Sequence, residues 1–131
     1  MNQVAKLVII GPNDTYLMLY RNQHPRFGND ADIPGGSVEA GEQPIEGMLR
    51  EVKEEIGIVV QANVVQKIYE GTRYGKLDVE YLLYSVTLTT EPQITLSWEH
   101  SGYEWLSRND FLTTAQNAQD SFMHMVYDRI K

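Results

Sequence analysis

Three glutamates in one predicted helix have the chemistry and the spacing to bind a cation. Glu51, Glu54 and Glu55 lie in segment 44–56, whose apolar residues recur at helical spacing. At about 100° per residue, the three carboxylates share one face of that helix. Like charges three and four residues apart repel each other by roughly a few tenths of a kcal/mol per exposed pair. A hard cation such as Mg²⁺, which prefers oxygen ligands, would offset this repulsion.

The acidic helix is also compatible with two arrangements that involve no metal. Arg50 lies four residues before Glu54 and forms a favourable pair with it, and Lys53 offsets a further part of the repulsion. A helix with glutamates on its outer side is also commonly no more than a solvated face. The helix alone therefore does not establish a metal site.

The spacing between this helix and the preceding glycine-rich loop is more specific. Nine positions of segment 36–58 define the pattern: Gly36, Glu42, Arg50, Glu51, Val52, Glu54, Glu55, Gly57 and Ile58. The pattern resembles the signature of the Nudix hydrolase superfamily, with every specified position present. Because seven positions are fixed to one residue type, a chance match is on the order of one in a billion per window. The length of the chain and its order of elements also resemble those of the family.

The resemblance implies a set of metal ligands. Glu51, Glu54 and Glu55 would bind Mg²⁺, or alternatively Mn²⁺, with the carbonyl of Gly35 as a further ligand. A polyphosphate is anionic and this chain is acidic, so a bridging cation is needed for binding. Such a cation polarises the phosphoryl oxygens and lowers the pKa of a bound water that attacks phosphorus.

The resemblance leaves the general base open between two residues. Glu51 is the first choice, and Glu99 is the second because its loop could reach the metal site. Arg50 is implied to pair with a neighbouring glutamate and orient it. The histidine that follows Glu99, His100, is not assigned a role.

Three further residues are candidates for substrate binding. Arg21 and Arg26 precede the Pro-Gly-Gly turn and could contact phosphate in a bidentate manner. Tyr74 lies sixteen residues after Ile58, a placement that resembles that of dinucleoside polyphosphate hydrolases of the family. Ordinary solvated arginines and a packed tyrosine are the alternative interpretations.

Composition narrows the class of protein and its partners. The 131 residues, 42% of them hydrophobic, fit one globular domain, 1–131. A net charge of −7 disfavours nucleic-acid polymers and anionic membrane surfaces as partners. The absence of cysteine excludes disulfides, thiolate zinc sites and a cysteine nucleophile. No apolar run reaches the length of a signal peptide or a membrane span, so a cytoplasmic protein is expected.

The elements that must position these residues follow from periodicity and turn signals. Pro44 and Gly57 are typical of the start and end of the helix that carries the glutamates. The fold class is α+β or α/β, with a mixed sheet flanked by helices, and the resemblance implies a Nudix-type α/β/α sandwich. The remaining predictions are a hairpin of strands 3–10 and 16–20, an irregular loop 21–36, a second hairpin of 59–74 and 79–88 with its turn at 75–78, short strands 94–98 and 103–106, and a helix 109–131.

The functional prediction is metal-dependent hydrolysis of a phosphoanhydride bond in a nucleoside diphosphate linked to another group. Nucleoside and deoxynucleoside triphosphates, ordinary or oxidised, are the leading substrates, and dinucleoside polyphosphates come second. The protein would bind this small nucleotide as a monomer or a homodimer. Two alternatives remain, a catalytically silent nucleotide-binding module and a protein-interaction face that binds no metal.

Overall fold

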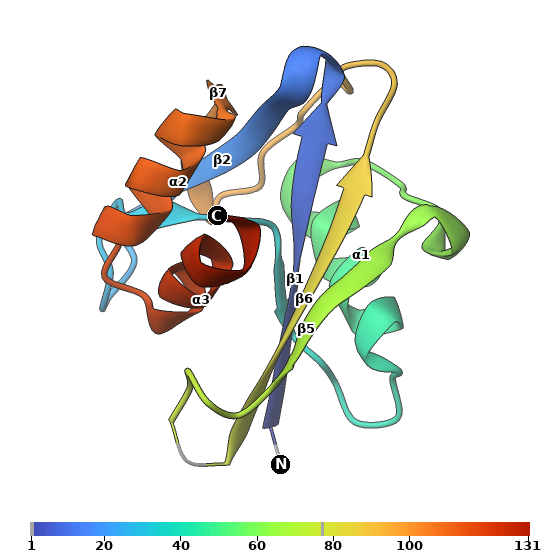
Figure 1. The fold of residues 1–131 in the computed structure, drawn as a ribbon. Coiled ribbons are helices and arrows are strands. Elements are labelled where there is room, and N and C mark those ends of the chain that lie inside the picture. Colours follow the sequence, from blue (N-terminus) through green and yellow to red (C-terminus); the bar gives the residue numbers. More distant parts are fainter. Residues whose placement is uncertain (1, 77) are drawn as a thin grey trace.

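A mixed seven-stranded sheet with helices on both faces forms the fold in the computed structural model, which describes residues 2–76 and 78–131. Figure 1 shows α1 on one side of the sheet and α2 and α3 on the other. In chain order the elements are β1 (Asn2–Gly11), η1 (Pro12–Asp14), β2 (Thr15–Arg21), β3 (Ala31–Asp32), β4 (Gly35–Ser37), α1 (Pro44–Ile56), η2 (Ala62–Val64), β5 (Gln66–Gly71), β6 (Val79–Thr87), β7 (His100–Ser107), α2 (Arg108–Asn117) and α3 (Ser121–Ile130).

Strands β1 and β2 form a hairpin that opens away from its turn. Their pairing holds only next to the turn, at Ile10 with Tyr16 and Gly11 with Thr15. Farther along, β4 pairs with residues 4–6 of β1, while β2 pairs with β3 and with β7. On its other edge β1 runs parallel to β6 over its length. The sheet is therefore open between β1 and β2, and the loop 22–30 and strand β4 lie at that opening.

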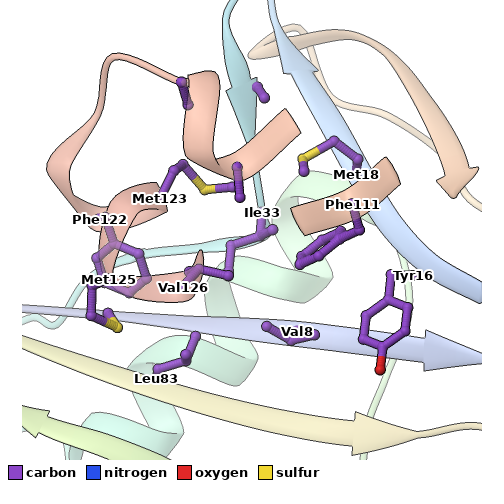
Figure 2. Packing of buried hydrophobic residues seen from close by; sticks show 13 residues of the cluster. Val8, Tyr16, Met18, Ile33, Leu83, Phe111, Phe122, Met123, Met125 and Val126 are labelled. Atoms are coloured by element: carbon purple, nitrogen blue, oxygen red, sulfur yellow. The ribbon is translucent and has the colours of Figure 1, made fainter. Parts of the chain in front are cut away.

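The alternation of side chains along β1 builds a separate core on each face of the sheet. Leu7 and Ile9 are fully buried against α1, whereas Val8 is fully buried against α2 and α3. This period of two is what a strand buried on both faces requires. Figure 2 shows the second core, in which Phe111 of α2 and Phe122 of α3 pack over the strands. The α/β/α arrangement predicted from the sequence is confirmed.

Helix α1 begins and ends at residues suited to those positions. Pro44 occupies the first turn, and the backbone N–H of Gln43 donates to the side chain of Glu46 at 2.8 Å. Gly57 ends the helix with φ 76°, in the left-handed region that glycine adopts without strain. The predicted helix 44–56 is confirmed, as are the two hairpins, although the first strand of the second hairpin is shorter than predicted. Leu77, in the predicted turn 75–78, lies outside the described residues.

The prediction that segment 21–36 lacks regular structure is wrong in part. It contains β3 and begins β4, because the opening between β1 and β2 leaves backbone groups of both strands to be paired. Sequence periodicity does not report a strand of two or three residues that is created by long-range pairing.

Two predictions for the second half of the chain are also wrong. Segment 94–98 is not a strand, and its backbone instead donates to the last turn of α1, from Thr95 to the carbonyl of Ile56 at 3.0 Å. The predicted helix 109–131 is two helices, because Asp120 accepts from the N–H of Phe122 and starts α3 anew. None of the helices in the described residues has both the length and the hydropathy to cross a membrane.

Candidate active site

A cavity of about 570 Å³ lies where β1 and β2 separate. Its volume falls in the range of small-molecule sites, roughly 300–1,000 Å³. Strands β1, β2, β3, β4, β6 and β7, helix α1 and the start of α3 all contribute lining residues. The charged residues of the lining form two groups. We call Glu51, Glu55 and Glu99 the acidic wall, and Lys6, Arg21, Asp32, His100 and Asp120 the buried ion-pair network.

Glu55 is the most buried member of the acidic wall. Its residue is 4% exposed, and Oε1 accepts a hydrogen bond from the backbone N–H of Gly35 at 2.9 Å. Burial raises the pKa of Glu55 to about 8, although the Gly35 N–H and the charge of Lys6 oppose the shift. The negative charge of Glu99 adds to the increase. This carboxylate therefore lies where a cation would be favoured.

Glu51 is half-buried beside the glycine turn. Burial raises its pKa, Arg50 lowers it, and the charges of Glu54 and Glu99 raise it again. A Cβ atom on Gly36 would lie 3.0 Å from Cδ of Glu51, a tight contact that would require the carboxylate to shift. Gly36 of the sequence pattern thus makes room for Glu51 at the cavity.

Arg50 holds the acidic residues of α1 and of the preceding loop together. Its Nε and Nη2 donate to the two carboxylate oxygens of Glu42 at 2.8 and 3.0 Å, a bidentate pair. Its Nη1 donates to Glu51 Oε1 at 3.0 Å and lies 3.5 Å from Glu54 Oε2. The guanidinium thereby fixes the position of the Glu51 carboxylate, while the carboxylate edge turned toward the cavity stays available.

The donor set of the acidic wall fits a hard divalent cation. Carboxylate oxygens are the ligands that Mg²⁺ prefers, and the charge of Glu99 makes ionisation of both Glu51 and Glu55 more costly. Across residues 2–76 and 78–131, no three acidic or histidine side chains gather closely enough to hold a metal without other ligands. Mg²⁺ is commonly held by one or two carboxylates, with waters and substrate phosphates completing its shell. The wall suits that mode of binding.

The predicted metal ligands are therefore placed unequally. Glu51 and Glu55 line the cavity, as does Gly35, whose N–H contacts Glu55. The side chain of Glu54 is 57% exposed and lies outside the lining, beside Arg50. Glu99, the second candidate for the base, lines the cavity and is exposed.

The buried ion-pair network ties four strands and a helix start together. Asp32 of β3 accepts from Lys6 of β1 at 2.6 Å, contacts His100 of β7 at 2.9 Å, and lies 3.3 Å from Arg21 of β2. Arg21 also donates to Asp120, at the start of α3, at 2.8 Å. Burial alone would raise the pKa of Asp32, but the attraction of Lys6 and the hydrogen bond from His100 outweigh it, so the pKa lies below its ordinary value.

Arg21 is the substrate-binding candidate that lies in the cavity, and its Nη2 is already shared between two carboxylates. Arg26 is exposed, with its guanidinium 5.2 Å from the ring of Phe27. Tyr74 donates to Asp128 at 2.8 Å. Neither Arg26 nor Tyr74 is among the described residues that line the cavity.

Sequence reasoning missed most of the ion-pair network and the aromatic residues of the cavity. Lys6 interrupts the apolar run of β1 and is 7% exposed, and a lysine in such a run signals a buried partner. Asp32 and Asp120 carry no comparable signal, because their partners lie far away along the chain. Trp98 and Phe27 also line the cavity.

Comparison with known sequences places the chain among proteins of one family. The family model described as NUDIX domain matches residues 1–126. The dihydroneopterin triphosphate diphosphatase of Escherichia coli (strain K12) is 34% identical over 119 residues, which cover 79% of this chain and 77% of that protein. The 8-oxo-dGTP diphosphatase of the same organism is 34% identical over 59 residues, covering 45% of this chain and 46% of the relative. The second match thus spans less than half of the relative's length.

Comparison with solved structures supports the same fold. The MutT protein from Methanosarcina mazei Go1 superimposes with a TM-score of 0.75 at 23% sequence identity, covering 98% of this chain and 91% of that one. At this identity the similarity concerns the fold alone, an open mixed sheet flanked by helices.

Proposed function

The chain belongs to the NUDIX family, and on that premise we propose that it hydrolyses a phosphoanhydride bond of a nucleoside diphosphate linked to another group, with a divalent cation as cofactor. The acidic wall is the observation that carries this proposal. Glu51, Glu55 and Glu99 line one cavity, and burial together with the charge of Glu99 raises the pKa of Glu51 and of Glu55. A polyphosphate binds next to such a wall only through a cation.

The chain's own residues would hold the reactants and take up the proton. When bound, the cation supplies charge neutralisation at the phosphoryl oxygens and acidifies the attacking water. Glu51, positioned by Arg50, is our first choice for the carboxylate that accepts the water's proton, and Glu99 is the second. The water oxygen bonds to phosphorus, the bridging P–O bond breaks, and its electron pair leaves with the other phosphate.

Nucleoside triphosphates, ordinary or oxidised, are the substrate class we propose first. Two relatives of the chain are named diphosphatases of triphosphates, one of 8-oxo-dGTP and one of dihydroneopterin triphosphate. The cavity volume of about 570 Å³ is in keeping with a nucleotide-sized ligand. Mg²⁺ and Mn²⁺ are the cofactors we propose, and Glu51, Glu54, Glu55 and the Gly35 carbonyl remain the proposed ligands.

Coupled phosphate release across a substrate panel tests this proposal. The panel holds NTPs, dNTPs, oxidised dGTP, dihydroneopterin triphosphate, ADP-ribose, nucleotide sugars and dinucleoside polyphosphates, each with Mg²⁺ and with EDTA. We expect turnover of at least one triphosphate that EDTA abolishes. Turnover confined to dinucleoside polyphosphates would support the second substrate class instead.

Thermal unfolding with and without Mg²⁺ separates the remaining alternatives. Mg²⁺ at about ten times its Kd should stabilise the native protein by about 1.4 kcal/mol, through preferential binding to the folded state. Stabilisation without turnover of any panel member would indicate a silent binding module. No stabilisation and no turnover would contradict the proposal and favour a metal-free interaction face.

A further inference from the structure

Trp98 exposes its indole at the candidate cavity. The residue is 81% exposed and lines the cavity together with Glu99 and His100, which follow it in the chain. The other tryptophan, Trp105 of β7, is partly buried against the core on the α1 side of the sheet. A tryptophan buries about 150–250 Å² when it is covered. Trp98 thus keeps a large apolar surface in water at the edge of a polar site.

The backbone around Trp98 is held in place although the side chain is not covered. The N–H of Ser97 donates to the carbonyl of Glu55 at 2.9 Å, which ties the segment to the last turn of α1. The side chain of Asn22 donates to the carbonyl of Trp98 at 2.9 Å, and the N–H of Asn22 donates to the carbonyl of Glu99 at 3.0 Å. The indole therefore extends from a backbone position that is anchored both to α1 and to Asn22, which follows β2.

We propose that Trp98 stacks on the ring system of the substrate, so that the site selects phosphoanhydrides that carry a planar heteroaromatic ring. This inference rests on the proposed function and adds to it the residue that contacts the ring. Rings of every such base have a π-face, and stacking on an aromatic side chain contributes whatever the pattern of hydrogen bonds on the ring edge. Tyr74, the aromatic candidate predicted from the sequence, donates to Asp128 outside the described lining, whereas Trp98 belongs to it.

Intrinsic fluorescence tests the inference directly, because the chain has two tryptophans. In Trp105→Phe, Trp98 is the reporter, and in Trp98→Phe, Trp105 is the reporter. The probe is dGTP with an imido bridge between its α and β phosphorus atoms, added with Mg²⁺. We expect the emission of Trp98 to be quenched on binding and that of Trp105 to stay unchanged. Inorganic tripolyphosphate with Mg²⁺, which has no ring, should leave the emission of Trp98 unchanged.

Kinetic variants give an independent readout. Replacing a stacking aromatic residue by alanine weakens binding by about 5- to 150-fold, so Trp98→Ala should raise KM for the panel's best nucleotide by that factor, with kcat nearly unchanged. Trp98→Phe keeps a ring and should recover most of the affinity. Binding of Mg²⁺ and tripolyphosphate, measured by calorimetry, should be the same in both variants and in the wild type.

The outcomes separate this inference from the function on which it rests. Mg²⁺-dependent binding of the imido analogue without a response of Trp98, or an unchanged KM in Trp98→Ala, would overturn the stacking role and leave the hydrolase proposal intact. Binding of tripolyphosphate without binding of the analogue would exclude a ring-selective site. If neither compound binds, both the inference and the proposed function fail.

Discussion

The ion-pair network and the acidic wall of the cavity differ in how their charges are balanced. In the ion-pair network, Lys6 and Arg21 face Asp32 and Asp120 across distances of 2.6–3.3 Å, so opposite charges are matched inside the protein. In the acidic wall, Glu51, Glu55 and Glu99 face the same cavity with like charges. The charges of the network are paired without a ligand and its residues join strands, although Arg21 Nε and His100 Nδ1 are buried without a hydrogen-bond partner among the described residues. In the wall, and within residues 2–76 and 78–131, only Glu51 is paired with a cationic side chain, Arg50, and under the proposed function a divalent cation balances the remaining carboxylates.

The largest effect that tests this comparison is the loss of stability in Asp32→Asn. The change leaves the buried ammonium of Lys6 without its carboxylate, and breaking a buried pair costs about 3–5 kcal/mol. Urea unfolding measures it. Asp128→Asn is the matched control, because its exposed pair with Lys131 is worth about 0–1 kcal/mol. Equal stabilities of the two variants would show that the network does not hold the strands together.

Unlike Asp32→Asn, neutral substitutions of the α1 glutamates should lower turnover without lowering the free energy of unfolding. Glu55→Gln keeps an oxygen for the Gly35 N–H and replaces a buried carboxyl whose ionisation burial already disfavours, so the metal-free protein should unfold no more easily than the wild type. Replacing a residue that only orients a metal ligand lowers metal affinity or activity by about 10- to 100-fold. Replacing a ligand itself should have a larger effect, so Glu55→Gln and Glu54→Gln should each lower kcat/KM by at least about 100-fold.

The matched control for these variants is Glu91→Gln, the same chemical change at an exposed position outside the described lining. Its kcat/KM and its unfolding curve should equal those of the wild type. Wild-type turnover in Glu54→Gln alone would remove that residue from the set of ligands. Wild-type turnover in both glutamate variants would contradict a metal site on α1.

A smaller effect is expected for Arg50→Lys, which keeps the charge and removes the planar fork. An ammonium cannot hold both oxygens of Glu42 and still reach Glu51 with the geometry of the guanidinium. Because Arg50 is a positioning residue, Arg50→Lys should lower kcat/KM by about 10- to 100-fold. It should also raise the Mg²⁺ concentration needed for half-maximal rate. A lower Tm with unchanged Mg²⁺ dependence would instead indicate a role limited to packing the loop on α1.

The smallest expected effect is the decrease in the free energy of unfolding at acidic pH that Asp32 of the network causes. The pKa of Asp32 is lowered in the folded protein, so Asp32 contributes stability above the pKa of an unfolded aspartate, about 3.9, and loses it as pH falls toward the folded value. One such group contributes at most about 1.4 kcal/mol per pH unit. Unfolding between about pH 4.5 and 2.5 should therefore be steeper in pH for the wild type than for Asp32→Asn. Equal slopes would contradict the shift.

The difference between the two groups also accounts for which parts could be predicted from the sequence. Helix α1 carries its own start, end and acidic residues within fourteen positions, 44–57, so local rules identify the helix and the carboxylates on it. Lys6, Asp32 and His100 meet only because β1, β3 and β7 gather at the opening of the sheet. That meeting depends on pairing between distant segments, which no window of the sequence contains.

The wrong strand at 94–98 has a comparable cause. Ile94 and Leu96 alternate with polar residues as in a half-buried strand, and both pack against the core on the α1 side. Burial of alternate side chains does not need a neighbouring strand, because the end of α1 accepts two of the segment's N–H groups, from Thr95 and Ser97. The periodicity is informative about burial and uninformative about hydrogen bonding.

The parallel pairing of β1 with β6 has a consequence for how the chain folds. Gln3 and Glu80 contact each other although 77 residues separate them, and chains rich in such distant contacts fold slowly. During synthesis, β1 emerges long before β6, with one hydrophobic edge left open to pairing with another chain. Lys6 places a charge in the middle of that apolar strand, as residues that oppose aggregation do. The lysine that is buried beside Asp32 in the folded protein is thus also the charge that interrupts the apolar run of β1 before Asp32 is synthesised.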